Sequence, residues 1–352
     1  MIRKPERTSH SANGSEGPTG DQAASSYIPH PELVDAAEVA VELGLPLLLT
    51  GEPGTGKTEC AKWVGHHFRI HAVHQFVAKS TSVATDLFYT YDALGRFSAS
   101  QLAEYIEQER DRAREPRRFV DYAALGKAII SSHDPQTISE FLLSGQSASA
   151  DGSQFIHPGS ASRSVVLIDE IDKAPRDFPN DLLDEIANMR FNVRELGDLR
   201  SPEITDRTLW PIIIITSNSE RQLPGPFLRR CVFYHIPFPK RRPERAEEEG
   251  DAYYIEDIVA ARLGSDFGGS TLAQDALAFF YHLRDGMRPS LGKKPATAEL
   301  LNWLVSLKSR TSDTGLGIPG ARDQAKRAIG LLLKNADDQD RGRKELDVWK
   351  KQ

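Results

Sequence analysis

The segment from Gly51 to Thr58 constrains the fold of this chain more than any other. It reads GEPGTGKT, which is a complete G-x-x-x-x-G-K-T pattern. An apolar run from Leu45 to Thr50 precedes it, and apolar residues at helical spacing follow it. Glycines in such a strand–loop–helix unit let successive backbone N–H groups surround phosphate oxygens, and the helix N-terminus adds positive charge. The sequence therefore predicts a nucleotide-binding loop on a parallel α/β sheet.

Each part of this loop has an expected role. Lys57 is expected to reach the β- and γ-phosphates of the nucleotide, and the Thr58 hydroxyl is expected to bind Mg²⁺. Backbone N–H groups around the glycines are expected to hold the α- and β-phosphates. The predicted nucleotide-binding residues of the loop are Gly51, Glu52, Pro53, Gly54, Thr55, Gly56, Lys57 and Thr58.

Other apolar runs have the character of strands that are buried on both faces of a parallel sheet. They are rich in β-branched or aromatic residues, and helical patterns separate them. We therefore expect a parallel sheet with helices between its strands. The three clearest runs are Ser164–Ile168, Leu209–Thr216 and Cys231–Ile236, and Val73–Ala78 is a weaker candidate.

Two adjacent carboxylates, Asp169 and Glu170, follow the run that begins at Ser164. Ligands of an open parallel sheet gather at the carboxyl ends of its strands, so Asp169 is expected beside the Mg²⁺ held by Thr58. Glu170 is then placed to orient and deprotonate a water that attacks the γ-phosphate. The alternative interpretation is that the acidic pair caps the helix that follows.

Polar residues at two more strand ends are candidates for the same site. Asn218 follows the isoleucine-rich run and is predicted to hydrogen-bond the γ-phosphate or the attacking water, although asparagine is also an ordinary turn residue. Arg229 and Arg230 directly precede the last run. They lie too far along the sheet to serve their own loop, which indicates that they face the nucleotide of a neighbouring subunit. The alternative is a harmless pair of surface arginines.

Composition limits the class of protein. The chain has 352 residues, enough for about two domains, and its 39% hydrophobic and 27% charged residues are typical of a soluble globular protein. Its formal net charge of −6 argues against a general nucleic-acid-binding surface. The apolar runs are too short to span a bilayer, so we expect a cytoplasmic protein. Two cysteines cannot form a disulfide framework.

Local composition divides the chain into five segments. Residues 1–26 are rich in serine, glycine and charge and are expected to form a disordered leader. Residues 27–240 form the predicted α/β nucleotide-binding core, with an insertion at about 100–160. A charged run ends this core, and helical patterns without strand signals follow it. They predict a small helical domain over 250–336 and a C-terminal tail over 337–352.

Together these motifs resemble those of the AAA+ ATPases, and within them the MoxR-like branch, with the related McrB-type AAA_5 ATPases nearby. GEPGTGKT resembles the Walker A motif, VVLIDE the Walker B motif, ITSN the sensor 1 motif and LPGPFLRRCVFYHIPFP the arginine-finger region. The motifs follow the order of the family and span residues 27–240. The resemblance implies a P-loop NTPase core of the AAA+ type, a helical lid over 250–336, and ATP with Mg²⁺ as cofactors.

The resemblance also implies roles for basic residues. In this group the finger usually aligns with the second arginine, so Arg230 is the first choice and Arg229 the alternate. Lids of the family usually carry a sensor 2 arginine where this chain has Lys293, Lys294 and Pro295. Lys294 is the nearest substitute in that position, but a lysine replaces a forked guanidinium poorly.

Two segments resemble elements that face a central pore in related rings. Residues 84–97 resemble a helix-2 insert, and residues 191–196 resemble part of a pre-sensor hairpin. The first segment contains Phe88 and Tyr89, which have two interpretations. If they are exposed, they could grip a polypeptide, and if they are buried, they pack the insert against its neighbours.

By resemblance we expect an ATPase that assembles into a homo-oligomeric ring, with six as the expected number of subunits. It would remodel or assemble a partner protein complex, as MoxR-like chaperones do. A von Willebrand factor A-domain partner would be a separate polypeptide, because the chain has no D-x-S-x-S metal motif. Three alternatives stay open: a nucleic-acid motor of the McrB type, a non-hydrolysing nucleotide-gated scaffold and a small-molecule P-loop kinase.

Overall fold

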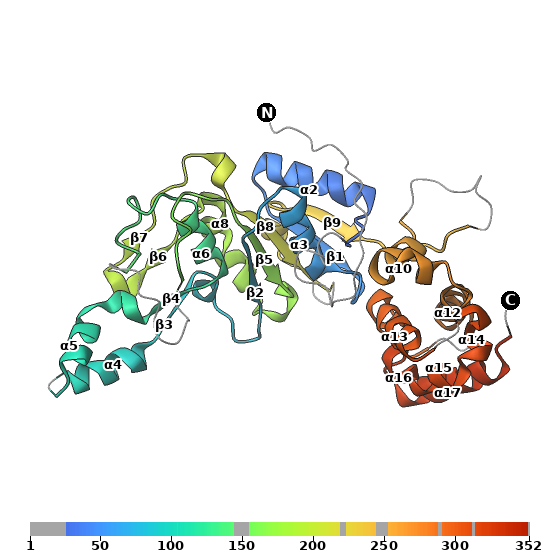
Figure 1. Ribbon diagram of the computed structural model, residues 1–352. Helices are drawn as coiled ribbons and strands as arrows, with labels where there is room; N and C mark the ends of the chain where they lie inside the picture. The colour runs from blue at the N-terminus through green and yellow to red at the C-terminus, as the bar shows by residue number, and fades with distance from the viewer. Residues whose placement is uncertain are drawn as a thin grey trace.

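Five parallel strands form the centre of the computed structural model (Figure 1). They are β1 (Leu47–Gly51), β2 (Val73–Val77), β5 (Val165–Asp169), β8 (Ile212–Thr216) and β9 (Val232–Ile236). They pair in the order β2-β5-β8-β1-β9. The predicted α/β fold is confirmed, and each strand lies within one residue of a predicted apolar run. The structure describes residues 26–103, 105–143, 155–218, 223–243, 253–287, 291–311 and 314–350. Almost all of the predicted leader lies outside them.

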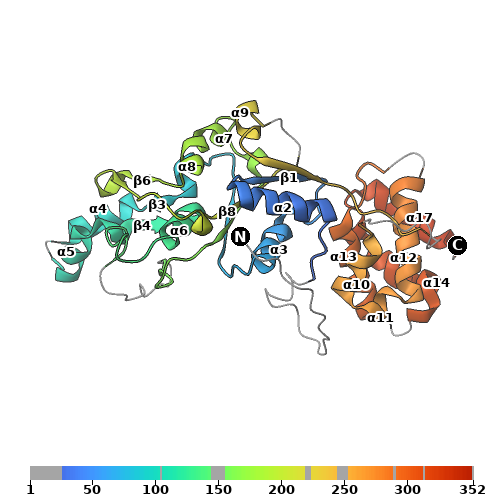
Figure 2. The ribbon, with the colours of Figure 1, turned by 90° about the horizontal axis from the view of Figure 1, so that it is seen from above.

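Helices cover both faces of the sheet. α2 (Pro31–Leu43) and α3 (Lys57–His67) pack on one face, whereas α6 (Ala124–Ser131) packs against β2 and β5 on the other (Figure 2). The His30 side chain caps the first turn of α2, and Gly44 ends the helix in a left-handed conformation. Glycine adopts this conformation without steric cost, so the helix ends there.

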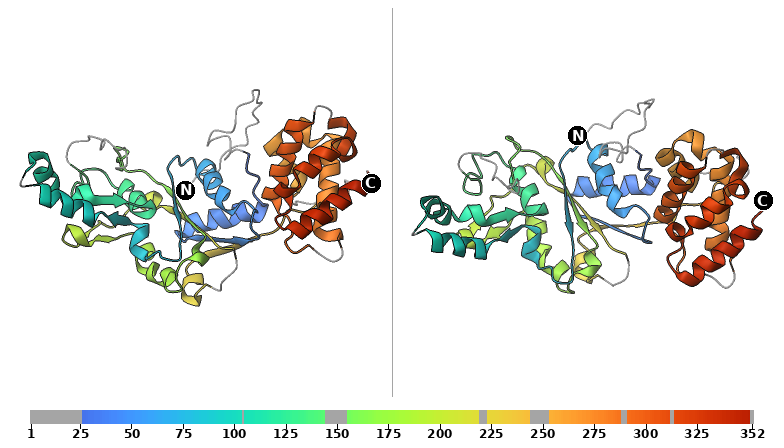
Figure 3. Two further views of the ribbon diagram at one scale, coloured as in Figure 1. Left: turned by 90° about the horizontal axis from the view of Figure 1, so that it is seen from below. Right: turned by 60° about the horizontal axis from the view of Figure 1, so that its bottom comes forward.

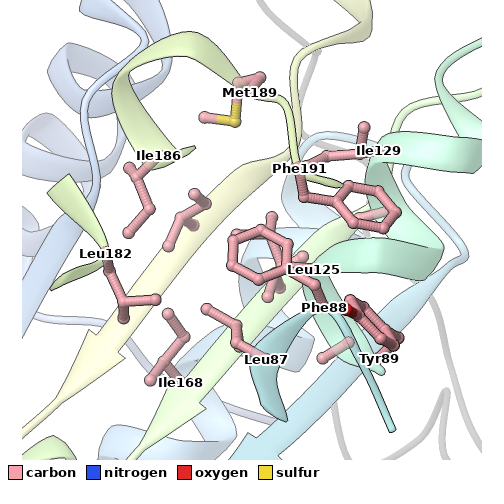
Figure 4. Packing of buried hydrophobic residues seen from close by; sticks show 14 of the residues in the cluster. Leu87, Phe88, Tyr89, Leu125, Ile129, Ile168, Leu182, Ile186, Met189 and Phe191 are labelled. Atoms are coloured by element: carbon pink, nitrogen blue, oxygen red, sulfur yellow. The ribbon is translucent and has the colours of Figure 1, made fainter. Parts of the chain in front are cut away.

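The strands contribute to two separate hydrophobic cores, because successive residues of a strand face opposite sides of the sheet. Leu47 and Leu49 of β1 join the core beneath α2 and α3. Leu48, between them, joins the core on the other face. Figure 4 shows this second core, where Leu125 of α6 lies near Ile168 of β5. All of these residues are buried, as a parallel sheet between two helix layers requires.

Part of the chain between β2 and β5 forms an arm at one end of the molecule (Figure 1). After η1 (Ala84–Leu87), the antiparallel pair of β3 (Tyr89–Tyr91) and β4 (Val120–Tyr122) carries the arm. Its end consists of α4 (Ala93–Leu102) and α5 (Glu107–Arg114), followed by η2 (Pro116–Phe119). The predicted insertion of about 100–160 is therefore misplaced at both ends, because the arm starts earlier and because α6, which lies inside that range, belongs to the core.

Phe88 and Tyr89 are packing residues, so the interpretation that they are exposed to grip a polypeptide is wrong. Both are buried, and the Phe88 ring stacks on Phe191 with 5.4 Å between ring centroids. The Tyr89 hydroxyl donates a hydrogen bond of 2.9 Å to Glu195 Oε2. Burial of two large aromatic side chains stabilises the base of the arm more than their exposure would.

Short elements complete the core between β5 and β9. The segment expected to resemble a pre-sensor hairpin contains β6 (Asn192–Val193), which pairs antiparallel with β7 (Leu199–Arg200). The other elements are η3 (Ile171–Lys173), α7 (Phe178–Asp181), α8 (Leu183–Asn188), η4 (Arg194–Leu196), η5 (Arg207–Leu209) and α9 (Gly225–Leu228).

A helical lid with its own hydrophobic core lies at the end of the molecule opposite the arm (Figure 3). The fully buried Trp303 is one of the largest side chains in this core. No described helix of the chain combines the length and the apolar character needed to cross a membrane. The lid elements are α10 (Ile255–Leu263), α11 (Ser265–Gly268), α12 (Thr271–Tyr281), the π-helical turn η7 (His282–Gly286), α13 (Thr297–Arg310), η8 (Thr314–Leu316), α14 (Gly317–Gly320), α15 (Arg322–Arg327), α16 (Ile329–Leu332) and α17 (Ala336–Val348).

The predicted C-terminal tail is part of the lid, which corrects the boundary expected at residue 336. Asn335 caps the N-terminus of α17, and its side chain accepts a hydrogen bond from the backbone N–H of Asp337. Leu346 and Trp349 are buried in the lid core. The segment is highly charged and has few apolar residues, so its sequence resembles a solvated tail although those few residues anchor it.

Leu346→Ala tests whether α17 belongs to the lid. Because Leu346 is fully buried, we expect the free energy of unfolding to fall by about 2–5 kcal/mol, measured by urea denaturation. Val348→Ala on the same helix is the control, because Val348 is 71% exposed and its replacement should change stability by less than about 0.5 kcal/mol. Equal effects of the two variants would contradict this placement of α17.

Candidate nucleotide site

The predicted phosphate-binding loop connects β1 to α3. Gly56 precedes α3 with φ at +85°, a left-handed conformation that L side chains rarely adopt. Lys57 folds back over the loop and donates from Nζ to the carbonyl oxygens of Gly51 at 2.9 Å and Glu52 at 3.0 Å. Burial lowers the pKa of Lys57, and the carboxylates nearby, Asp172 foremost, oppose this shift. The lysine therefore has a fixed position at the mouth of the loop.

Asp169 is at the C-terminal end of β5 and accepts hydrogen bonds from three other elements. Thr216 of β8 donates to Oδ1 at 2.6 Å, and Gln75 of β2 donates to Oδ2 at 3.1 Å. The hydroxyl of Thr58, at the start of α3, lies 3.2 Å from both carboxylate oxygens. Thr216 and Gln75 were not predicted as site residues, because only the pairing of β5 with both neighbours brings them to Asp169.

The oxygen atoms of Thr58 and Asp169 fit a Mg²⁺ ion. Mg²⁺ prefers oxygen ligands at 2.0–2.1 Å in octahedral geometry, which places neighbouring ligand oxygens about 3 Å apart. The 3.2 Å separation of Thr58 Oγ1 from the Asp169 oxygens is close to that spacing. A bound Mg²⁺ would neutralise charge on the phosphates, and these two residues would hold it.

Glu170 and Asn218 meet at the same edge of the sheet. Glu170 has a left-handed backbone with φ of 56°, and its N–H donates to Thr216 Oγ1 at 2.8 Å. Its Oε1 lies 3.5 Å from Asn218 Nδ2, and its Oε2 is 2.5 Å from Lys173 Nζ. Non-glycine residues in this conformation cost of order 1–3 kcal/mol and concentrate at functional sites. The two side chains that the sequence predicts at neighbouring strand ends therefore lie side by side.

A pocket of about 360 Å³ lies above this edge. It brings together most of the predicted residues, from the loop, β5 and the end of β8, and it adds an apolar side that sequence analysis missed. That side comes from the segment before α2 and from the lid. Such residues have no motif of their own. The sequence signal for the segment before α2 is the change of composition after residue 26, and the signal for the lid is its helical pattern. The predicted residues in the lining are Pro53, Gly54, Thr55, Gly56, Lys57, Thr58, Asp169, Glu170 and Asn218, and the added ones include Tyr27, Ile28, Tyr253, Ile258 and Leu301.

Three predicted basic residues do not line this pocket. Arg229 and Arg230 are exposed at the N-terminal end of β9. The phosphate loop begins beside Ile236, the last residue of β9, which lies roughly 20 Å along the strand from Arg230. Lys294 is half-exposed and forms an ion pair of 3.6 Å with Asp285. The arginines therefore cannot reach the pocket of their own chain.

Comparison with known proteins identifies the family. Residues 42–222 match the family model described as AAA domain, which covers just over half of the chain. The chain belongs to this family. As a member it is an AAA+ protein with a nucleotide-binding fold. No curated protein sequence matches the chain.

Solved structures resemble it at low identity. A single-residue variant of RuvB from Thermotoga maritima has 12% identity and a TM-score of 0.40, and the match covers 90% of this chain and 68% of that one. PCH-2 from C. elegans also has 12% identity, with a TM-score of 0.36 and coverage of 85% and 65%.

Thr216→Val tests the support that β8 gives to Asp169. The valine keeps the shape of the side chain but removes the donor to Asp169 and the acceptor for the Glu170 N–H. Loss of such support typically weakens a metal site 10- to 100-fold, so the Mg²⁺ concentration for half-maximal nucleotide binding should rise by about that factor. Titration of Mg²⁺ against a fluorescent ATP analogue measures it.

Thr216→Ser is the matched variant, because serine retains the hydroxyl. Its Mg²⁺ midpoint should stay close to that of the unmodified protein. If the serine and valine variants shift the midpoint equally, the hydroxyl of Thr216 does not support the metal site.

Proposed function

We propose that this protein is a ring-forming AAA+ ATPase that hydrolyses ATP to remodel or assemble a partner protein complex, in the manner of MoxR-like chaperones. The observation that carries the proposal is the meeting of four side chains at one edge of the sheet: Thr58, Asp169, Glu170 and Asn218. A phosphate loop alone supports binding, whereas a carboxylate and an amide beside it support attack of water on the γ-phosphate.

The roles follow from position in the pocket. Backbone N–H groups of the loop residues other than Pro53 would hold the phosphates, and Lys57 would exchange its bonds to loop carbonyls for bonds to phosphate oxygens. Thr58 and Asp169 would hold Mg²⁺. Glu170 would accept a proton from the attacking water, and Asn218 would orient that water or the γ-phosphate.

The exposed arginines would act between subunits. Arg230, or Arg229 in its place, would reach the nucleotide of a neighbouring copy and stabilise charge in the transition state. A finger supplied in this way contributes about 10³- to 10⁵-fold to the rate, equivalent to about 4–7 kcal/mol. The proposed assembly is a homo-oligomeric ring of six subunits, and an isolated monomer would barely hydrolyse ATP.

The proposed partner is a protein complex, and a separate von Willebrand factor A-domain protein is the kind of helper that the MoxR-like resemblance favours. The proposed location is the cytoplasm. Lys294 is a weaker proposal as sensor 2, because its ion pair with Asp285 points it away from the pocket lining.

Glu170→Gln separates ATP binding from ATP hydrolysis. Glutamine retains the size and hydrogen bonding of the side chain but cannot accept the proton, so steady-state turnover should fall by about 10²- to 10⁴-fold while ATP binding persists. Lys57→Ala is the comparison variant, and it should weaken binding itself. Normal turnover by Glu170→Gln would exclude Glu170 as the base. An unmodified protein that binds ATP tightly but does not hydrolyse it would favour a scaffold in which ATP only sets conformation.

A mixture of two inactive variants tests whether sites are shared between subunits. Glu170→Gln and Arg230→Ala should each turn over poorly alone, whereas a one-to-one mixture should recover part of the activity. Turnover per subunit of the unmodified protein should also rise steeply with protein concentration. High turnover that stays constant on dilution to a monomer would exclude the proposed ring. If Arg229→Ala, rather than Arg230→Ala, restores activity in the mixture, Arg229 is the arginine finger.

A further inference from the structure

Arg284 connects the lid to the phosphate loop through an ion pair in which the arginine is nearly buried. Its Nη2 donates to Oε2 of Glu52 at 2.7 Å. The arginine side chain is only 6% exposed, whereas that of Glu52 is half-exposed. Glu52 belongs to the predicted loop, but its side chain turns away from the pocket lining and toward the lid. Of the loop side chains, it is therefore the one that contacts a lid cation.

The guanidinium of Arg284 contacts two further parts of the chain. Nη1 donates to the carbonyl oxygen of Pro295 at 2.8 Å, just before α13. The guanidinium carbon lies 3.5 Å from the ring centroid of Phe238, in the segment that joins β9 to the lid. Arg284 is itself part of the π-helical turn η7, and such turns are frequent at functional sites. One side chain thus holds the loop, the connecting segment and the start of α13 together.

The loop is held at the same residue from the other side. The carbonyl oxygen of Glu52 accepts hydrogen bonds from Lys57 Nζ at 3.0 Å and Thr55 Oγ1 at 2.8 Å. A movement of Glu52 toward or away from the lid would therefore move the partner of the lysine that serves the phosphates. Glu52 therefore contacts the lid through its side chain and Lys57 through its carbonyl oxygen.

The start of α13 packs directly on the loop. A Cβ atom built on Gly54 would lie 3.2 Å from Ala296 Cβ and 3.3 Å from Ala298 Cβ, so the backbone of the loop approaches the lid closely here. Pro295, which accepts from Arg284, immediately precedes these alanines. The ion pair and this contact are consequently two parts of one interface between loop and lid.

From these contacts we infer that Arg284 is a positioning residue that couples the lid to the phosphate loop, with the ion pair to Glu52 as the coupling element. The inference rests on the proposed ATPase function. A buried cation is costly without its carboxylate, so lid movement that separates the pair is opposed unless the loop follows. Nucleotide bound in the loop and the position of the lid should therefore depend on each other.

A double-mutant cycle tests the coupling. The variants are Glu52→Gln, Arg284→Gln and their combination, and the readouts are kcat and KM for ATP, together with ATP-dependent hydrogen exchange at the start of α13. Each single variant should lower kcat by about tenfold with little change in KM, and the combination should be no worse than the poorer single variant. The slowing of hydrogen exchange by ATP should be lost in all three.

Arg343→Gln is the control, because it removes an exposed lid arginine paired with Asp340 and remote from the loop. It should match the unmodified protein. If the effects of the two single variants multiply, or if Glu52→Gln leaves both kcat and ATP-dependent exchange unchanged, the coupling is wrong. If Arg284→Gln fails to fold, kcat and ATP-dependent exchange of Glu52→Gln still test the coupling. If the unmodified protein binds no ATP, both the proposed function and the coupling are wrong. If every variant turns over ATP normally, only the coupling is wrong.

Discussion

The carboxylate of Asp169 is the interaction on which the candidate site depends. It lies at the end of β5, and donors from β2, β8 and α3 converge on it. Hydrogen bonds from several elements hold this carboxylate in one position, as a site for a divalent cation requires. The parallel pairing of β5 with β2 and β8 creates this convergence, so the strand order that defines the sheet also assembles the site.

Local motifs made much of the site predictable. The loop from Gly51 to Thr58 and the pair Asp169 and Glu170 follow apolar strands, and in a parallel sheet the ends of such strands meet at one edge. Thr216, Gln75 and the apolar side of the pocket were not predictable in this way. Their roles depend on strand order and on contacts between segments far apart in the chain, and neither leaves a periodic signal in the sequence.

Two expectations that the structure corrects, the C-terminal tail and the exposure of Phe88 and Tyr89, have a common physical cause. α17 is held by a few buried residues among many charged ones, so its composition resembles that of a tail. In the arm, Phe88 and Tyr89 have the aromatic character of a binding surface, yet both pack against Phe191. Residue type indicates what a side chain can do, whereas burial depends on neighbours that the local sequence does not name.

The pocket has walls from parts of the chain that are separated by most of its described length. Tyr27 precedes α2, whereas Leu301 lies within α13 of the lid. A ligand that fills the pocket therefore acts as a non-covalent cross-link between the sheet domain and the lid. By mass action such a ligand at one hundred times its dissociation constant adds about 2.7 kcal/mol to the stability of the state that binds it. The resistance of the lid to unfolding would then report the nucleotide concentration around the protein.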